Sequence, residues 1–153
     1  MKVPTRWTCL IVATLAPTLG ACGDEDPLGP EDVEYATELG IDIDRMTRLP
    51  TGVYIETLMP GFGSRTLMLS DSVDMSYTLW LPNGVELQSG EFSVFLTSLI
   101  PGFQDGVDGM TKGEIRLILI PPARGYGDNP PAGIPPNAVL VFRVELLEIQ
   151  TIE

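Results

Sequence analysis

Tyr126 is a side chain whose sequence neighbours could hold it in one place. It lies within residues 120–138, a stretch that contains proline pairs and three glycines, Gly125, Gly127 and Gly133. Proline fixes φ, and glycine admits backbone angles closed to other residues, so such a loop can be irregular and still well defined. It can therefore position side chains. The alternative is that it only connects two elements, which its spacing alone leaves open.

Most group-transfer chemistry is excluded by composition. The chain has no histidine, and of its two cysteines Cys9 falls in an N-terminal leader and Cys22 directly after it. Ser-His-Asp hydrolysis, Cys-His nucleophilic catalysis and histidine-based metal sites are therefore excluded. The acidic residues are scattered, as solvated surface charges are, and there is no phosphate-binding or dinucleotide-binding glycine loop. We expect no metal and no cofactor.

The loop leads directly into residues 139–149, which alternate between two faces. This period of two predicts a half-buried antiparallel strand. One face carries Leu140, Phe142, Val144 and Leu146, and the other carries Val141, Arg143 and Glu145. Phe142 is therefore expected to point into the interior.

Two motifs in this region carry a family resemblance. They are Ala-Arg-Gly-Tyr-Gly at residues 123–127 and Gly-Ile-Pro-Pro-Asn-Ala-Val-Leu-Val-Phe-Arg-Val-Glu-Leu-Leu at residues 133–147. Together they closely resemble the C-terminal signature of the FKBP-type peptidyl-prolyl cis-trans isomerases. The second match is long and has no gap.

The resemblance implies an enzyme (EC 5.2.1.8) that accelerates rotation of X–Pro bonds in folding proteins. The barrier of about 20 kcal/mol comes from amide resonance, which is lost in the twisted bond. Water stabilises the planar, more dipolar amide, so an apolar pocket that fixes the flanking carbonyls favours the twisted state by differential binding. No covalent intermediate is needed.

The resemblance also implies which residues form the pocket. In the family, the hydroxyl at Tyr126 and the backbone N–H at Ile100 hold substrate carbonyls. Aromatic walls and floor are implied at Tyr77, Phe92, Phe103 and Phe142, with further lining from Leu87, Gln88, Leu99, Ile100 and Ile134. Each aromatic could instead be an ordinary core residue, and their occurrence together in family order favours the pocket.

The sequence departs from the family pattern in four places. Gln88 replaces a usual aspartate, Leu87 a common phenylalanine, and Phe103 a frequent tryptophan. The loop between Gly127 and Ile134 is also about one residue shorter than in the familiar eukaryotic members. We expect macrolide inhibitors as ligands, but with lowered affinity, and a modest catalytic rate.

The rest of the chain indicates an α+β domain, an antiparallel sheet of five to six strands wrapped around one short helix. Residues 71–81 alternate strongly, which turns Tyr77 inward, and residues 112–120 are apolar on both faces near their end. Phe103, Val107 and Met110 lie at helical spacing after Pro101. Glycines at 102, 106 and 109 weaken that helix, so the sheet must hold it. Other strands are expected at 52–58, 85–90 and 91–96.

The N-terminus reads as a secretory leader that becomes a lipid attachment site. Lys2 and Arg6 precede a short apolar run from Trp7 to Ala16, too short to span a bilayer, which needs about 20 residues. The leader ends in Leu-Gly-Ala-Cys, which resembles the lipobox of bacterial lipoproteins, with Cys22 acylated. An ordinary cleaved leader is the alternative.

Three segments follow from these patterns. Residues 1–21 are the lipoprotein signal peptide, 22–49 an acidic tether and N-terminal extension with a short helix at 31–39, and 50–153 the isomerase domain. The net charge of −12 disfavours nucleic acid and anionic membrane surfaces. We expect a monomer held to the membrane of a bacterial cell envelope only by lipid on Cys22, facing the periplasm, with proline-containing polypeptides as substrates.

Two other functions remain open from sequence. The same fold could be a non-catalytic module that binds proline peptides, in the manner of a chaperone, and Gln88 favours this reading. The chain could also be a structural lipoprotein of the envelope that only resembles the family.

Overall fold

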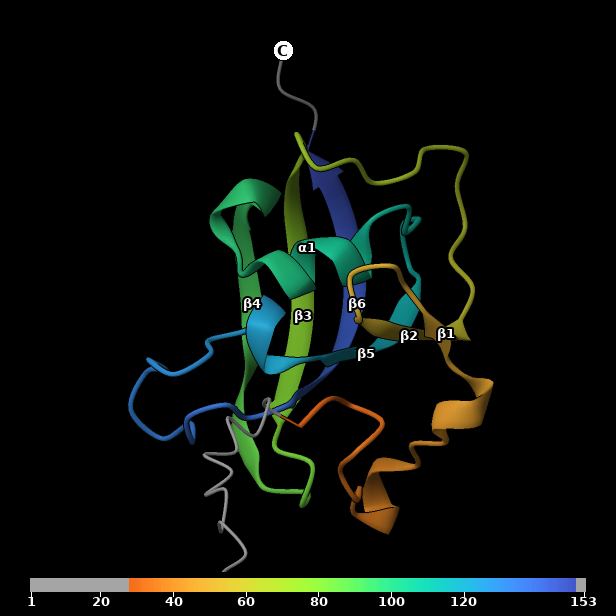
Figure 1. The fold of residues 1–153 in the computed structure, drawn as a ribbon. Coiled ribbons are helices and arrows are strands. Elements are labelled where there is room, and N and C mark those ends of the chain that lie inside the picture. The colour runs from red at the N-terminus through yellow and green to blue at the C-terminus, as the bar shows by residue number, and fades with distance from the viewer. Residues whose placement is uncertain (1–27, 151–153) are drawn as a thin grey trace, which may run out of the picture.

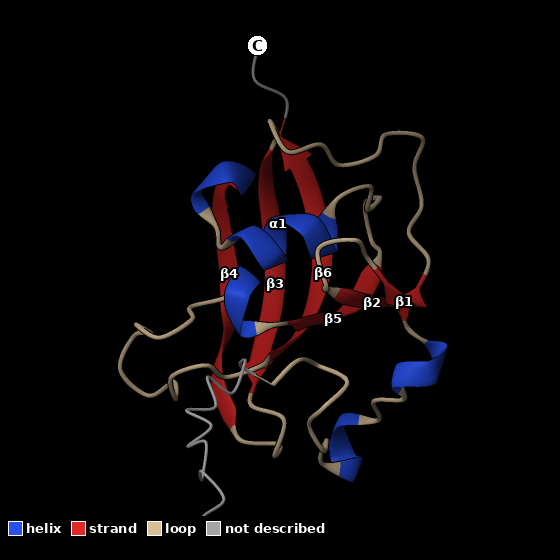
Figure 2. Cartoon of the chain, viewed as in Figure 1, coloured by secondary structure: helices blue, strands red, loops and turns tan. Residues whose placement is uncertain are grey.

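The computed structural model describes residues 28–150, so Cys22 and the predicted leader lie outside the described residues. Six strands form one antiparallel sheet in the order β1-β2-β5-β6-β3-β4. The α+β prediction is confirmed, with a single α-helix, α1, among the described residues (Figure 2). The strands are β1 (Thr47–Arg48), β2 (Tyr54–Met59), β3 (Ser72–Trp80), β4 (Glu86–Phe95), β5 (Ile115–Ile120) and β6 (Leu140–Gln150).

The main core lies between α1 (Pro101–Val107) and one face of the sheet, which α1 crosses in front of β3 and β6 (Figure 1). The predicted alternation of β3 is confirmed, because Val73, Met75 and Leu79 are buried and Tyr77 is partly buried against the same core. The two strands predicted at 85–90 and 91–96 form one continuous edge strand, β4.

The predicted alternation of β6 holds as far as Leu146 and then reverses. Leu146 pairs with Met75 and Glu148 with Asp74, so Leu147 is an extra residue in the ladder. Such a bulge turns the following side chains to the opposite face. Ile149 is consequently buried in the main core.

The helix is shorter than the predicted segment because it ends at Val107, with Asp108 as its C-cap. Pro101 occupies its first turn as expected. Met110 lies beyond the helix but is fully buried, and its carbonyl accepts a hydrogen bond from Leu67 N–H at 2.7 Å.

The N-terminal extension covers the other face of the sheet. A second core joins buried Met46 to Tyr54, Leu117, Leu119 and Val141 of the sheet, and partly buried side chains of the extension pack against it: Tyr35, Leu39, Ile41 and Ile43. The sheet itself begins at Thr47, ahead of the boundary expected at Pro50. The helix predicted at 31–39 is wrong, because only a 3₁₀ turn, η1 (Thr37–Leu39), forms before Gly40.

Other short 3₁₀ turns are η2 (Ile43–Arg45), η3 (Leu96–Ser98) and η4 (Pro122–Arg124). Among the described residues, no helix has the length and apolar character needed to cross a membrane.

Candidate active site

An apolar cavity of about 310 Å³ opens between the sheet, α1 and the segment that follows η4. The sheet contributes side chains from β3, β4 and β6, and the turn into α1 closes the opposite side. The lining consists of Tyr77, Leu79, Gln88, Phe92, Ser98, Leu99, Ile100, Phe103, Tyr126 and Phe142.

Four aromatic rings form a closed circuit in this cavity. The centroid of Tyr77 lies 5.3 Å from that of Phe92 and 6.4 Å from that of Phe142. Phe103 completes the circuit, with its centroid 6.0 Å from Phe92 and 5.2 Å from Phe142. All four pairs are tilted or edge to face, the arrangements that aromatic quadrupoles favour. Phe103 is 3% exposed and forms the floor.

The backbone at the start of α1 brings a polar group to the cavity. Ile100 is the N-cap residue, and its carbonyl accepts hydrogen bonds from Phe103 N–H at 3.0 Å and Gln104 N–H at 3.2 Å. Within residues 28–150, no hydrogen bond is donated by the Ile100 N–H. The Gln104 side chain donates to Leu99 O at 2.6 Å and so fixes the backbone directly before Ile100. An N–H at the edge of an apolar cavity can donate a hydrogen bond to the carbonyl oxygen of a ligand.

Tyr126 enters the cavity from a segment that is tied at both ends. Before it, the N–H groups of Gly125 and Gly127 both donate to Pro122 O, at 3.0 and 3.1 Å. After it, Asn137 closes the base of the loop, because its N–H donates to Gly127 O at 2.8 Å and its side chain to Asp128 at 2.7 Å. Gly127 and Gly133 adopt positive φ, as predicted for glycines of this loop, and Asn137 adopts it too.

The surroundings of the Tyr77 phenol in the cavity favour its neutral form. Burial, and to a lesser degree the nearby Tyr126, raises the pKa of the Tyr77 phenol above its ordinary value. Neither Asp nor Glu is among the ten lining residues. The site can therefore bind and orient an apolar substrate with neutral hydrogen-bonding groups.

A smaller cavity of about 130 Å³ adjoins the first and shares Leu79, Gln88 and Tyr126 with it. Leu87 and Ile134 line this second space together with residues 131–133. All ten residues expected at the site from the family resemblance thus line one cavity or the other.

Sequence reasoning missed two residues that line the larger cavity, Leu79 and Ser98, and residues 131–133 of the smaller one. Leu79 follows Tyr77 by two on the inward face of the predicted strand, so the alternation itself could have identified it. Ser98 lies in η3, and its hydroxyl donates to Phe95 O at 2.6 Å. No periodic signal marks a residue in so short a turn.

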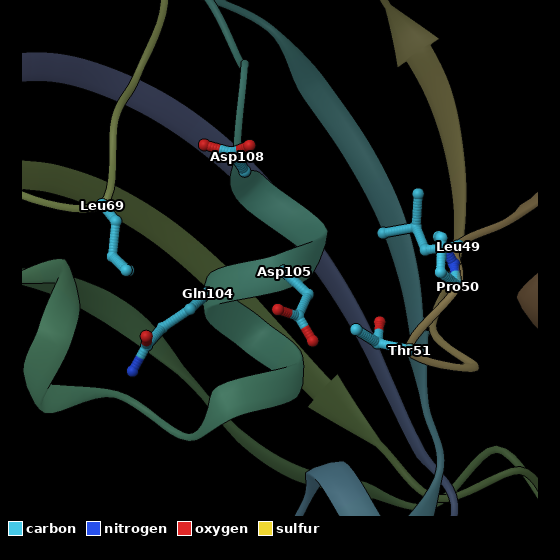
Figure 3. Close-up of a pocket in the computed structure, with 7 residues that line it drawn as sticks. All are labelled: Leu49, Pro50, Thr51, Leu69, Gln104, Asp105 and Asp108. Carbon is cyan, nitrogen blue, oxygen red and sulfur yellow. The ribbon is translucent and has the colours of Figure 1, made fainter.

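Another cavity, of about 350 Å³, lies on the outer side of α1 (Figure 3). Its walls are the turn at Leu49–Thr51 and Leu69, and α1 contributes Gln104, Asp105 and Asp108. It contains no aromatic ring and is lined by two carboxylates. Among the described residues, no group of three or more His, Cys, Asp or Glu side chains could hold a metal ion.

Comparison with known proteins shows which family the chain resembles. A profile of the FKBP-type peptidyl-prolyl cis-trans isomerase family matches residues 63–147. A protein named FK506-binding protein from Neisseria meningitidis serogroup B is 35% identical over 106 residues, which cover 64% of this chain and 96% of that protein. The FKBP-type isomerase FkpA of Escherichia coli is 34% identical over 133 residues, covering 83% of this chain and 47% of FkpA.

Solved structures show the same fold. The crystal structure of E. coli FkpA superposes with a TM-score of 0.67 at 30% identity, over 74% of this chain and 55% of FkpA. A peptidyl-prolyl cis-trans isomerase from Pseudomonas syringae gives a TM-score of 0.65 at 25% identity, over 70% of this chain and 82% of that one.

Proposed function

The chain belongs to the FKBP-type peptidyl-prolyl cis-trans isomerase family, and on that premise we propose that it catalyses X–Pro rotation in the aromatic cavity between β3, β4, β6 and α1. The isomerase activity follows from the family. The location of the reaction and the roles of individual residues are our proposal. The observation that carries it is the closed circuit of four rings beside the Tyr126 side chain and the Ile100 N–H.

The proposed mechanism uses the apolar character of the cavity. A prolyl ring lies on the floor made by Phe103, with Tyr77, Phe92 and Phe142 as walls. Removing water from the X–Pro amide weakens the stabilisation of its planar, dipolar form more than that of the twisted form. The rotation barrier of about 20 kcal/mol, which arises from amide resonance, is lowered accordingly.

Two hydrogen-bond donors of the protein hold the substrate peptide on either side of its rotating bond. The Tyr126 hydroxyl and the Ile100 N–H each donate a hydrogen bond to a substrate carbonyl, one on each side of the X–Pro bond. Holding the ends in a reactive arrangement reduces the entropic part of the barrier. Leu87 and Ile134, in the adjoining cavity, contact a side chain next to the proline.

The absence of a carboxylate from the lining sets the ligand preference. Gln88 touches both cavities and is neutral, so a bound ligand gains no charge-assisted hydrogen bond there. The Neisseria relative is named for FK506, and we propose that such a macrolide binds this chain in the same cavity with lowered affinity.

We propose further that lipid on Cys22 holds the domain to a membrane of a bacterial cell envelope, facing the periplasm, as a monomer. The Leu-Gly-Ala-Cys ending of the leader supports this. Several acyl chains anchor a protein firmly, whereas one chain anchors it only marginally. A Cys22→Ser variant should lose labelling by a fatty-acid analogue and move from the membrane fraction to the soluble one. Retention of the label would contradict the proposal.

The site is tested by following a peptide of the type Ala-Leu-Pro-Phe with two measurements. Turnover is measured in a protease-coupled assay, and binding by amide shifts in NMR spectra of the labelled protein. We expect turnover, with the largest shifts around Gln88, Ile100 and Tyr126. Shifts centred instead on Leu49 and Asp108, at the outer cavity of Figure 3, would overturn the assignment of the site. Absence of turnover would overturn the catalytic role.

A further inference from the structure

Arg124 joins the segment that carries Tyr126 to the helix that carries the cavity floor. Its Nε lies 2.9 Å and its Nη2 2.6 Å from Oδ2 of Asp105. Asp105 is on α1, and Arg124 is the last residue of η4, two positions before Tyr126. The contact therefore links two elements that are 19 residues apart in sequence.

The backbone at Arg124 rests on the same helix. A Cβ atom added to Gly102 would lie 2.9 Å from Arg124 O and 3.1 Å from Arg124 Cβ. Only glycine leaves room for this approach. Gly102 and Asp105 are three residues apart, so they share one side of α1. Arg124 is thus attached to α1 at two points, by its backbone on the first turn and by its guanidinium on the second.

The two elements joined in this way carry the two groups that we expect to hold the substrate. Ile100 is the N-cap of α1, and Tyr126 follows η4. We infer that the ion pair between Asp105 and Arg124 positions the Tyr126 hydroxyl relative to the Ile100 N–H. Arg124 and Asp105 are positioning residues, since neither is among the residues that line the aromatic cavity.

Because the Arg124–Asp105 ion pair is partly exposed, breaking it should change the reaction rate more than the stability of the fold. The side chains of Arg124 and Asp105 are 35% and 23% exposed, and partly exposed ion pairs contribute little to the free energy of unfolding. A fixed orientation, by contrast, affects the rate even when displacements are small. Gln104 is close to the other proposed donor, because its side chain donates a hydrogen bond to the carbonyl of Leu99, the residue before Ile100. Figure 3 shows the Gln104 side chain on the side of α1 nearer Leu69 and the Asp105 side chain on the side nearer Thr51.

The inference rests on the proposed role of Tyr126 and is tested by a double-mutant cycle between Arg124→Gln and Tyr126→Phe. We expect Arg124→Gln to lower kcat/KM by about two- to tenfold, and by no more than Tyr126→Phe does, mainly through kcat, with Tm close to that of the parent. If Arg124 acts through the Tyr126 hydroxyl, adding Arg124→Gln to Tyr126→Phe should cost little more activity. Additive losses, or no loss in Arg124→Gln, would overturn the inference.

Two further variants sharpen the result. The exchange Asp105→Arg with Arg124→Asp restores opposite charges and should recover part of the activity that each single change removes. Glu148→Gln serves as a control, because it breaks a more exposed ion pair with Lys112 far along β6, and we expect unchanged kcat/KM. A loss in this control equal to that in Arg124→Gln would count against positioning. An unchanged rate in Tyr126→Phe alone would refute the role of Tyr126, whereas a loss there without one in Arg124→Gln refutes only the positioning.

Discussion

The rings of Phe103 and Phe142 meet edge to face, with centroids 5.2 Å apart and an interplanar angle of 85°. Phe103 comes from α1 and Phe142 from β6, and both side chains are buried. The contact that seats the helix on the sheet is therefore also the floor of the aromatic cavity. Changes here should affect folding and catalysis together, unlike changes at the rim.

Phe103→Ala tests this shared role. Removing a buried phenylalanine costs about 3–5 kcal/mol of unfolding free energy. We expect a loss of this size in urea unfolding, together with a large fall in kcat/KM measured where the variant is folded. Phe103→Leu should recover much of the stability but not the activity, because the flat aromatic floor is still missing. Full activity in Phe103→Leu would show that an aromatic floor is unnecessary.

Tyr126→Phe should lower catalytic activity without lowering stability. The ring stays in place and only the hydroxyl is lost, so the urea midpoint should change little. A hydrogen bond to substrate contributes about 0.5–1.5 kcal/mol, which corresponds to a fall in kcat/KM of about 2- to 12-fold. The measurement is a protease-coupled assay beside an unfolding curve. Equal activity in the two proteins would remove the proposed role of the hydroxyl.

Much of the sheet could be predicted because its strands are half-buried and alternate. In β3 the inward positions from Val73 to Leu79 follow the period of two without a break. In β6 the same reasoning fails after Leu146, because the bulge at Leu147 is set by pairing with β3 and leaves no local signal. The pattern of one sequence does not show which distant strands pair with each other.

The N-terminal extension was harder to interpret for a related reason. Leu39, Ile41, Ile43 and Met46 have no regular period, since they lie in or beside short turns. A signal did exist elsewhere, because residues 112–120 are apolar on both faces near their end. A strand of that kind needs a cover on each side. Leu117 and Leu119 of β5 indeed lie under the extension.

The site residues came from family resemblance, and the structure explains why composition could not supply them. Phe92, Phe103 and Phe142 look like core aromatics in sequence, and physically they are packed against the core. Only the arrangement of several strands around one cavity distinguishes them. Their catalytic roles stay predictions.

The activity should be independent of pH near neutrality. No Asp, Glu or His lines the aromatic cavity, and burial raises the pKa of Tyr77 above the ordinary value of about 10. Since the raised pKa belongs to the folded state, the stability that neutral Tyr77 contributes is complete below about pH 10 and is lost as the pH rises further.

We therefore expect kcat/KM to vary by less than about twofold between pH 5.5 and 8.5, measured by NMR exchange spectroscopy, which needs no coupling protease. A bell-shaped profile in the parent protein would indicate acid–base groups that this site does not contain.

A protein that begins at Pro50 should be less stable than one that begins at Leu28. The shorter chain lacks β1 and Met46, and it exposes Leu119 and Val141, which are fully buried in the described structure. Burial of one large apolar side chain contributes about 1.5–3 kcal/mol, so a loss of at least about 3 kcal/mol is expected in urea unfolding. The aromatic cavity is on the opposite face of the sheet, and kcat/KM of the folded fraction should be preserved. Equal stability of the two chains would contradict the role assigned to the extension.

Gly106→Ala should destabilise the protein although alanine is the better helix former. In an exposed helix the change would gain about 1 kcal/mol. Here the new Cβ would lie 2.4 Å from Cγ2 and 2.8 Å from Cδ1 of Ile118, which is fully buried in β5. Forcing extra atoms into a packed core costs about 1–3 kcal/mol, so the steric term should exceed the gain in propensity.

The sign of the change in urea unfolding free energy decides between these two effects. Gly90→Ala on β4 is the matched control, because a Cβ there meets no atom within 4 Å, and it should change stability by less than about 0.5 kcal/mol. Ile118→Leu removes the Cγ2 branch and should recover part of the loss when combined with Gly106→Ala, as expected for residues in direct contact. A stabilised Gly106→Ala protein would mean that α1 does not depend on close approach to β5, and that the helix holds its position over the cavity by other contacts.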